Sequence, residues 1–320
     1  KKFLVVGAGI SGIAATELLI KHNVSVILYD AKEEQKPEEI RKKSPILAEV
    51  ELVLGELPET MIEQCDIAIL SPGVPIDIPI VERMKKAGMQ IWGEIELAYA
   101  FEQGKVLAIT GTNGKTTTTS LLGEIIKHAS FDVKVVGNIG IPYTSMVSDT
   151  TKESITVAEI SSFQLETVHK FCPQVSAILN ITPDHLNRHH TMETYCQTKE
   201  RITINQGNDQ VCVLNYEDSI LREFAKNLKT KVIFFSSQRE LEQGIYLEGE
   251  KIIWKWKEQK EVVCNVRELQ LIGKHNYENV MAATAMALTV GISIEKIREV
   301  LVSFVAVPHR IEYVVTRRGV

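Results

Sequence analysis

The sequence predicts an α/β protein with two parallel sheets, each covered by helices. Apolar strand patterns alternate with helix patterns along the chain, and a glycine-rich turn joins a strand to a helix at two places. Alternation of this kind is typical of parallel sheets, because each step to the next parallel strand needs a crossover, usually a helix. A length of 320 residues is too great for one ordinary domain and fits two or three.

The first predicted domain, residues 1–93, is a Rossmann-like parallel sheet. Its strands are expected at residues 3–6, 24–29 and 66–70, and its helices at 10–22 and near 80–87. The third strand ends at a Ser-Pro-Gly turn, residues 71–73, which is a signal for a loop. We expect the domain boundary between residues 93 and 104.

The pattern restarts after Trp92, and the second predicted domain covers residues 94–306 with a P-loop-type ATPase pattern. Strands are expected at 106–109, 155–158, 175–179, 211–214 and 232–235. Helices are expected at 116–129, with its apolar residues along one face, and near 276–290 and 294–304. Residues 244–263 have the pattern of short antiparallel strands at a sheet edge, and residues 307–320 that of a linker and the start of a further domain.

Composition and charge narrow the class of protein. Apolar residues make up 44% and charged residues 24% of the chain, the balance of a soluble globular protein. A net charge of −5 gives no electrostatic footprint for nucleic acid or an anionic membrane. No apolar run approaches the ~20 residues needed to span a bilayer. Five cysteines are scattered without a paired spacing, so we expect a cytoplasmic protein without nucleic-acid or membrane partners.

The first glycine-rich turn, Gly7-Ala8-Gly9-Ile10-Ser11-Gly12, is a complete G-x-G-x-x-G between a strand and a helix. The glycines allow a close approach of the backbone, and a helix N-terminus favours a phosphate. Asp30 ends the next strand, where an acidic residue would meet a ribose hydroxyl. NAD, FAD or a uridine diphosphate would suit this place, and a turn that simply needs glycine would explain it too.

The second turn, residues 110–117, reads Thr-Gly-Thr-Asn-Gly-Lys-Thr-Thr after a predicted strand and before a helix. Backbone N–H groups in such a loop cradle phosphates, Lys115 can reach the β- and γ-phosphates, and the Thr116 hydroxyl can hold Mg²⁺. The strict pattern G-x-x-x-x-G-K-[ST] needs glycine where this chain has Ile109, so the loop is a shortened relative. Gly-Lys-Thr after a strand indicates a nucleotide site more often than an idle turn.

The motif at 110–117 is similar to the ATP loop of the Mur ligases and of folylpolyglutamate synthetase. Residues 159–166, Glu-Ile-Ser-Ser-Phe-Gln-Leu-Glu, resemble the segment typical of Mur ligases that add D-glutamate. The match extends over the whole chain in the expected order, through residues 71–73, 137–140, 180–186, 195–202, 273–276 and 308–310. These motifs are specific as a set, and on them the chain is identified as a member of the Mur ligase family.

The resemblance implies an ATP-dependent amide ligase of peptidoglycan precursor synthesis, and we expect a monomer. ATP would phosphorylate the L-alanine carboxylate of UDP-N-acetylmuramoyl-L-alanine, and the amine of D-glutamate would attack the acyl phosphate, giving ADP and phosphate. The implied catalytic residues are Lys115, His185 and Lys199. The family also implies a C-terminal Rossmann-like domain for glutamate with an Asp-Ser-Lys motif, which we expect to be essentially absent because the chain stops at Val320.

The same resemblance assigns binding residues. Those implied for ATP are Gly111, Thr112, Asn113, Gly114, Lys115, Thr116, Thr117, Asn276, Asn279 and Arg310. Those implied for the nucleotide-sugar substrate are Ser11, Gly12, Asp30, Gly73, Asn138, Ser161, Gln164 and His185. Two Mg²⁺ ions are implied, and their ligands would be Thr116, Glu159, His185 and Lys199. Lys199 would carry a carbamate formed from CO₂, which turns a cation into an oxygen ligand.

Three other interpretations remain open from the sequence. Another Mur ligase or a folylpolyglutamate synthetase-like enzyme would share the ATP loop, although residues 161–164 argue against both. A flavin or nicotinamide oxidoreductase would explain the first glycine turn and leave residues 110–117 idle. A non-catalytic nucleotide-binding module would keep both turns, but it would not need His185 or Lys199.

Overall fold

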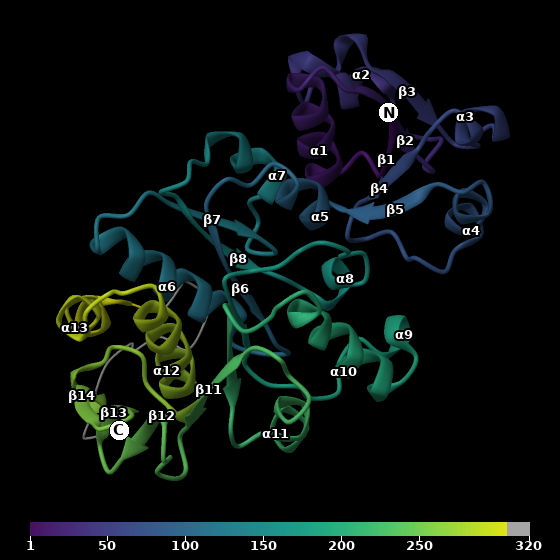
Figure 1. Cartoon of the computed structure of the whole chain (residues 1–320). Coiled ribbons are helices and arrows are strands. Elements are labelled where there is room, and N and C mark those ends of the chain that lie inside the picture. Colours follow the sequence, from purple (N-terminus) through teal and green to yellow (C-terminus); the bar gives the residue numbers. More distant parts are fainter. Residues whose placement is uncertain (306–320) are drawn as a thin grey trace, which may run out of the picture. The chain divides into compact units, whose positions relative to one another are not determined.

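A computed structural model of the chain describes residues 1–305, and Figure 1 shows its helices and strands. The chain divides into two compact units. Unit 1 contains Lys1–Gln103, Val136–Thr151 and Ser161–Phe171, and unit 2 contains Gly104–Val135, Lys152–Ile160 and the described residues from Cys172 on. The sequence predicts domains that are continuous in the chain, with limits at residues 93 and 306. These limits stay predictions.

Unit 1 is built on a five-stranded sheet in which every neighbouring pair of strands is parallel. The strand order is β3-β2-β1-β4-β5. The strands are β1 (Lys2–Val6), β2 (Ser25–Asp30), β3 (Glu51–Leu54), β4 (Ile67–Leu70) and β5 (Gln90–Gly93). The chain therefore starts in the centre of the sheet, extends it to one side, and returns past β1 to extend the other. In such a sheet, ligands bind beyond the carboxyl ends of the two strands where the order reverses, here β1 and β4.

The helices of unit 1 are mostly short. They are α1 (Ile10–Lys21), α2 (Pro37–Arg41), α3 (Glu59–Glu63), α4 (Pro79–Lys86), α5 (Glu94–Tyr99), α7 (Tyr143–Met146) and α8 (Ser162–Leu165), with 3₁₀ turns at Pro45–Glu49 and Val147–Asp149. Helix α1 buries Ile13, Leu18 and Leu19 and packs against α5 and α7. This packing fixes the start of α1, and with it the glycine turn that precedes the helix.

Unit 2 is built on a nine-stranded sheet with the order β14-β13-β12-β11-β10-β9-β6-β8-β7. The strands are β6 (Lys105–Thr110), β7 (Val133–Gly137), β8 (Ile155–Glu159), β9 (Val175–Ile178), β10 (Val211–Asn215), β11 (Lys231–Ser236), β12 (Gly244–Glu248), β13 (Lys251–Trp256) and β14 (Gln259–Asn265). The pairs from β8 through β6, β9, β10 and β11 to β12 are parallel. The pairs β12–β13 and β13–β14 are antiparallel, with a register shift between Ile252 and Ile253.

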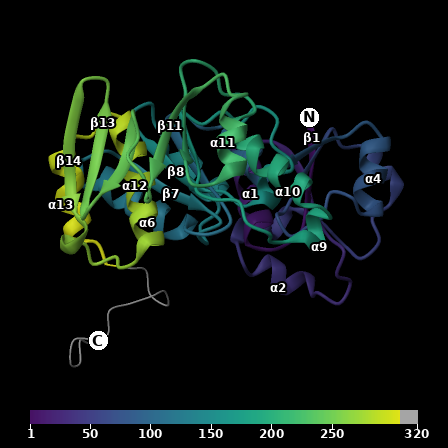
Figure 2. The ribbon, with the colours of Figure 1, turned by 90° about the horizontal axis from the view of Figure 1, so that it is seen from below.

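The helices of unit 2 complete its core. They are α6 (Lys115–His128), α9 (Leu186–His189), α10 (Met192–Glu200), α11 (Ser219–Ala225), α12 (Lys274–Thr289) and α13 (Ile294–Ser303), with 3₁₀ turns at Arg201–Thr203 and Val266–Glu268. Helix α12 packs against α6 and strands β9 to β11, and α13 packs against α6 and β14. Figure 2 shows β13, β14 and α13 together at one end of the sheet. The core between the helices and the sheet is mainly aliphatic. The small alanine side chains of α12 allow this helix to lie close to α6 and the sheet.

The structure confirms the predicted parallel sheets and the antiparallel edge. The strands that the sequence pattern did not indicate, β3, β5 and β7, are only partly buried, so their residues do not form a continuous apolar run. No helix within residues 1–305 combines the length and the apolar character needed to cross a membrane.

Candidate active site

The carboxyl ends of three neighbouring strands in unit 2 form the floor of the site. In the register of the sheet, Ile109 of β6 lies opposite Glu159 of β8, and Thr110 of β6 lies opposite Ile178 of β9. The segments that follow these strands carry most of the predicted ATP and metal residues of unit 2. Parallel pairing therefore brings residues 111–117, Glu159 and residues 180–185 to one edge, although they lie far apart in the sequence.

The phosphate loop runs from Gly111 to Gly114 and opens helix α6. Both glycines have left-handed backbone angles, with φ of 147° at Gly111 and 87° at Gly114. A Cβ on Gly114 would lie 2.2 Å from Oδ1 of Asn279, so α12 passes very close to the loop. The first turn of α6 contains no acidic residue. A helix N-terminus of this kind attracts phosphate through its first N–H groups and its dipole.

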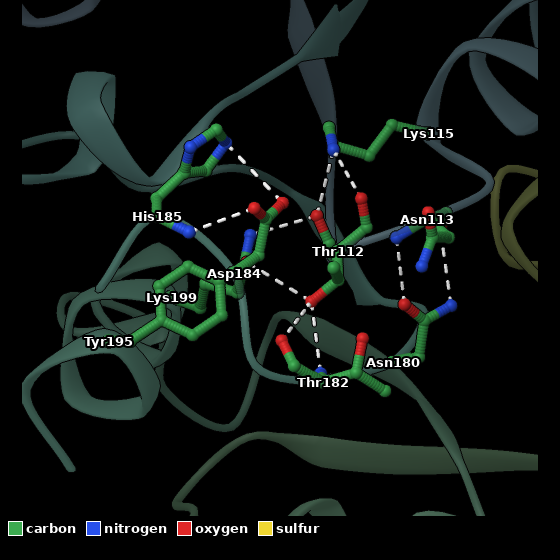
Figure 3. Close-up of polar contacts among 10 residues, drawn as sticks. Thr112, Asn113, Lys115, Asn180, Thr182, Asp184, His185, Tyr195 and Lys199 are labelled. Atoms are coloured by element: carbon green, nitrogen blue, oxygen red, sulfur yellow. Dashed lines mark hydrogen bonds and ion pairs between the residues drawn. The ribbon is translucent and has the colours of Figure 1, made fainter. Parts of the chain in front are cut away.

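The side-chain nitrogens of two lysines donate to the same carbonyl of this loop. Lys115 Nζ donates to the backbone oxygens of Gly111 and Thr112, at 2.9 Å each, and Lys199 Nζ donates to the Gly111 oxygen at 2.8 Å. Figure 3 shows Lys115 and Lys199 approaching the loop from different elements. Burial of Lys199, with the nearby charge of Lys115, lowers the pKa of its amine to about 7. A large part of this amine is thus neutral near pH 7.

His185 begins the short helix α9 in the left-handed backbone region, with φ of 51°. The carboxylate of Asp184 accepts the backbone N–H of His185 at 2.8 Å and lies 3.4 Å from its Nε2. About half of each side chain is exposed, at 50% for His185 and 43% for Asp184. The strained backbone, which only a few side-chain types tolerate, holds the imidazole at the rim of the site.

Two of the predicted metal ligands, Glu159 and Thr116, have oxygen donors and belong to elements that meet at this edge of the sheet. Glu159 is 1% exposed at the end of β8, and Thr116 lies in the first turn of α6. Within residues 1–305, no three His, Cys, Asp or Glu side chains gather as a ready-made metal centre. This set fits Mg²⁺, which is usually held by one or two protein ligands together with water and substrate phosphates.

A cavity of about 470 Å³ extends from the phosphate loop along helix α12. Its lining residues are Asn113, Gly114, Thr117, Leu179, Asn180, Phe235, Leu271, His275, Asn276, Glu278 and Asn279. The predicted pair Asn276 and Asn279 lies one turn apart, and Asn279 Nδ2 donates to Asn276 Oδ1 at 3.4 Å. Three apolar side chains, Leu179, Phe235 and Leu271, line the cavity together with several polar ones, a combination typical of a ligand pocket.

A separate cleft of about 450 Å³ lies within unit 1. It is lined by Gly9, Ile10, Ser11, Ser71, Pro72, Gly73, Gly137, Asn138, Gly140, Pro142 and Gln164. Four of the residues predicted for the nucleotide-sugar, Ser11, Gly73, Asn138 and Gln164, therefore meet in one cleft at the carboxyl ends of β1 and β4. His185 belongs to unit 2, and its contact with substrate stays a prediction.

The other predicted residues of unit 1 support the walls of this cleft. Asp30 accepts the backbone N–H groups of Ala8 at 2.8 Å and of Lys32 at 3.0 Å, which fastens the glycine turn. A Cβ on Gly12 would lie 1.8 Å from the Gly7 oxygen, so only glycine fits there. Ser161 caps α8 in a capping box with Gln164, whose Oε1 accepts the Ser161 N–H at 2.9 Å.

Comparison with known proteins decides the family. The chain matches the Mur ligase MurD-like N-terminal domain at residues 1–93 and the Mur ligase middle domain at residues 109–287. A UDP-N-acetylmuramoylalanine–D-glutamate ligase from Lachnoclostridium phytofermentans is 55% identical over 320 residues, which cover 100% of this chain and 70% of that protein. This chain belongs to the Mur ligase family. A ligase of the same name from Clostridioides difficile is 44% identical over 315 residues, covering 98% of this chain and 69% of that protein.

Solved structures of other Mur-type ligases share the fold. UDP-N-acetylmuramate:L-alanyl-gamma-D-glutamyl-meso-diaminopimelate ligase from Neisseria meningitides matches with a TM-score of 0.63 and 17% identity, covering 97% of this chain and 99% of that chain. UDP-N-acetylmuramate-alanine ligase from Thermotoga maritima matches with a TM-score of 0.55 and 20% identity, covering 99% of this chain and 71% of that chain. At these identities the likeness shows the fold alone.

Several residues of this Mur ligase site were not singled out from the sequence. Asn180, Thr182 and Tyr195 hydrogen-bond to the phosphate loop, while Phe235 and Glu278 line the nucleotide cavity. Asn180 and Thr182 follow the end of β9, the strand that pairs with the strand before the phosphate loop. This position in the sequence could have indicated that they contact the loop. Arg310, predicted to neutralise ATP phosphate, lies outside the described residues.

Proposed function

We propose that this protein adds D-glutamate to UDP-N-acetylmuramoyl-L-alanine at the expense of ATP. The match to D-glutamate ligases over the whole chain carries this conclusion, and the phosphate loop beside a nucleotide cavity supports it. The γ-phosphoryl group passes to the L-alanine carboxylate, which gives an acyl phosphate and ADP. The amine of D-glutamate then attacks the acyl carbon, phosphate leaves, and the amine loses a proton as the amide forms.

Charge neutralisation is the main task of the protein in the first step, because two anions must approach each other. Lys115 needs only to exchange its two loop carbonyls for phosphate oxygens, since its ammonium already lies at the loop. The first turn of α6 supplies N–H groups to the same phosphates. The cavity beside Asn276 and Asn279 takes the remainder of the nucleotide.

Mg²⁺ supplies further charge stabilisation at the transferring phosphoryl group. Mur ligases use ATP with Mg²⁺, and we propose two ions here. Thr116 and Glu159 would hold one ion, and His185 with Lys199 as a carbamate would hold the other. The buried Lys199 amine, with its pKa lowered to about 7, supports the carbamate because only a neutral amine reacts with CO₂.

The cleft of unit 1 is proposed to hold the nucleotide-sugar. The glycine turn and Ser71 to Gly73 leave room for a diphosphate at the carboxyl ends of β1 and β4. UDP should therefore displace labelled UDP-N-acetylmuramoyl-L-alanine from the protein, whereas NADH and FAD should not. Tight NADH binding without competition from UDP would instead support the oxidoreductase interpretation.

We further propose that the enzyme acts in the cytoplasm as a monomer with small molecules as its partners. All five cysteines are free, which fits a reducing compartment. Light scattering during gel filtration of the full-length protein measures the mass, and a dimer at micromolar concentration would refute the monomer.

The deciding experiment measures phosphate release by the full-length protein with pairs of acceptor and amino acid. Release is expected with UDP-N-acetylmuramoyl-L-alanine together with D-glutamate, and not with L-glutamate, L-alanine or a diamino acid. A preference for L-alanine on UDP-N-acetylmuramate would assign another reaction of the family. ATP binding without turnover on any pair would support a non-catalytic module.

A further inference from the structure

Asn180 holds the first half of the phosphate loop by three hydrogen bonds. Its backbone oxygen accepts the N–H of Thr112 at 2.9 Å, and its Oδ1 accepts the N–H of Asn113 at 2.8 Å. Its Nδ2 donates back to the backbone oxygen of Asn113 at 3.0 Å. Figure 3 shows this reciprocal pairing between Asn113 and Asn180. The backbone N–H groups of Thr112 and Asn113 are thus used within the protein.

The hydroxyl of Thr112 is also fully used within the protein. It donates to the Thr182 oxygen at 3.1 Å, accepts the Thr182 N–H at 3.0 Å, and lies 3.0 Å from the Tyr195 hydroxyl. A hydroxyl has one proton and two acceptor sites. Because its proton goes to Thr182, the Tyr195 hydroxyl must be the donor in the third contact. No hydrogen-bonding capacity then remains for a phosphate.

The partners of these bonds are themselves fixed. Leu179 continues the ladder of the sheet by donating its N–H to the Thr110 oxygen at 3.0 Å. Ile181 donates its N–H to Asp218 Oδ2 at 2.8 Å, and Asp218 also caps helix α11. The ring of Tyr195 is 1% exposed in helix α10. The loop is therefore fastened to the segment after β9 and to helix α10, and the segment after β9 is in turn fastened to helix α11.

We propose that Asn180, Thr182 and Tyr195 form a bracket whose role is to position the phosphate loop for ATP. In this bracket the backbone amides of Thr112 and Asn113 and the Thr112 hydroxyl bind no phosphate. Phosphate contact falls to Lys115 and the first turn of α6. The three bracket residues are positioning residues, and this inference rests on the proposed ATP-dependent reaction.

The bracket matters because electrostatic catalysis depends on donors that are in place before the phosphate arrives. If the loop were free to shift, part of the binding energy of ATP would be consumed in ordering it. Weakening the bracket should therefore raise the KM for ATP and lower kcat while leaving the KM for the nucleotide-sugar unchanged. General destabilisation of the fold would not separate the two KM values.

The first test replaces Asn180 by Ala in the full-length protein. About a tenfold rise in the KM for ATP is expected, equal to about 1.4 kcal/mol, with the KM for UDP-N-acetylmuramoyl-L-alanine within twofold of wild type. Asn227→Ala, at an exposed position after α11, is the matched control and should change neither constant. A KM for ATP within twofold of wild type in Asn180→Ala would overturn the proposal.

A second test does not depend on Asn180, which also lines the nucleotide cavity. Thr112→Val should raise the KM for ATP by about fivefold to tenfold, because it removes three hydrogen bonds, and Thr112→Ser should restore it. Tyr195→Phe removes one of these bonds and should raise it by about threefold. Thr230→Val, at a buried threonine just before the amino end of β11, is the control.

The double variant Asn180→Ala/Thr112→Val separates a bracket from independent ATP ligands. If both residues act through one fixed loop, its KM for ATP should rise less than the product of the two single effects. Multiplicative effects, or an unchanged KM in Tyr195→Phe, would show that the residues act separately and would refute the bracket. A wild-type protein that releases no phosphate on any substrate pair would refute the proposed function instead.

Discussion

The two glycine turns of this protein begin the same way, as a parallel strand entering a helix, yet they are fastened very differently. The turn after β1 is held mainly by the carboxylate of Asp30 on the Ala8 N–H, with backbone contacts and longer bonds from Ser71 and Lys43. The turn after β6 is held by side chains from several segments. Those that bond to it are Lys115, Asn180, Tyr195 and Lys199.

This difference matches the work proposed for each turn. The work proposed for the turn in unit 1 is to hold a nucleotide-sugar far from its reacting carboxylate, so one short bond between Asp30 and the turn is sufficient. The turn in unit 2 aligns a phosphoryl group in transfer, where a shift of the loop changes the rate. Substitutions at five positions follow, from the largest expected effect to the smallest, and those in and around the two turns test the comparison.

Lys199→Ala should have the largest effect, a loss of turnover of about 10³ or more, because neither alanine nor an ammonium supplies oxygen ligands to a metal ion. Acetate or formate in the assay should restore part of the rate by occupying the space that is left. Lys199→Arg should stay inactive, since it keeps the positive charge. An arginine variant with wild-type turnover would show that no carbamate is needed.

Lys115→Ala should lower turnover by about 10² or more, because it removes charge stabilisation of the transferring phosphoryl group. Folding should change little, since the Lys115 ammonium donates to two carbonyls of its own loop. Lys127→Ala, at the exposed far end of the same helix, is the control for loss of a lysine from α6. Steady-state kinetics and a melting curve decide: activity within a few-fold of wild type would place Lys115 outside the ATP site.

Alanine at a glycine of each turn compares the two directly. Gly114→Ala should destabilise the protein by about 1–3 kcal/mol and raise the KM for ATP, because φ is 87° and Asn279 lies within 2.2 Å of the new Cβ. Gly9→Ala has no atom within 4 Å of its Cβ and should change stability by about 1 kcal/mol or less.

The outcome of the glycine comparison is measured by chemical denaturation and by the KM of each substrate. Gly9→Ala should raise only the KM for the nucleotide-sugar, since a Cβ there would occupy space in its cleft. Equal destabilisation by both substitutions would show that the two turns are constrained alike and would remove the contrast.

Glu94→Gln should have the smallest effect, visible in the pH dependence of stability. Burial raises the pKa of the Glu94 carboxyl, although Thr144 donates to it from both its N–H and its hydroxyl. A carboxyl with a raised pKa favours the folded state when protonated. Wild-type stability should therefore fall as the pH rises from the ordinary glutamate range through the folded pKa.

The neutral glutamine removes this pH dependence, so the stability of Glu94→Gln relative to wild type should increase with pH. Unfolding free energies measured in urea between pH 4.5 and 8 test it. A difference that stays constant over this range would mean that Glu94 does not titrate on its own in the folded protein.

The sequence predicted the parts of this site that depend on local pattern. Residues 110–117 predict a phosphate loop, because binding of nucleotide phosphates needs glycine and lysine at a fixed spacing. Asn276 and Asn279 were placed on one helix face because three residues make about one turn, and their side chains are hydrogen-bonded in the structure. Parallel strands β6, β8 and β9 were recognisable because their buried segments are apolar.

The remaining parts depend on contacts between segments distant in sequence. Nothing in the chain near Asn180 shows that its amide pairs with the backbone of Asn113, 67 positions earlier. The sequence predicts a ribose contact for Asp30, but not the two backbone N–H groups that its oxygens accept in the structure. The return of residues 136–151 and 161–171 to unit 1 also escaped prediction, because such segments carry no periodic pattern of their own.

The antiparallel end of the large sheet has an edge strand, and the residues of that strand decide whether it can pair with another chain. Strand β14 lies at the end of the strand order, and an edge strand can pair with another chain. Its first residues, Gln259, Lys260 and Glu261, are exposed and polar, and the register shift at Ile252 bends its partner strand. Charge and curvature at this edge together oppose strand-to-strand pairing through β14.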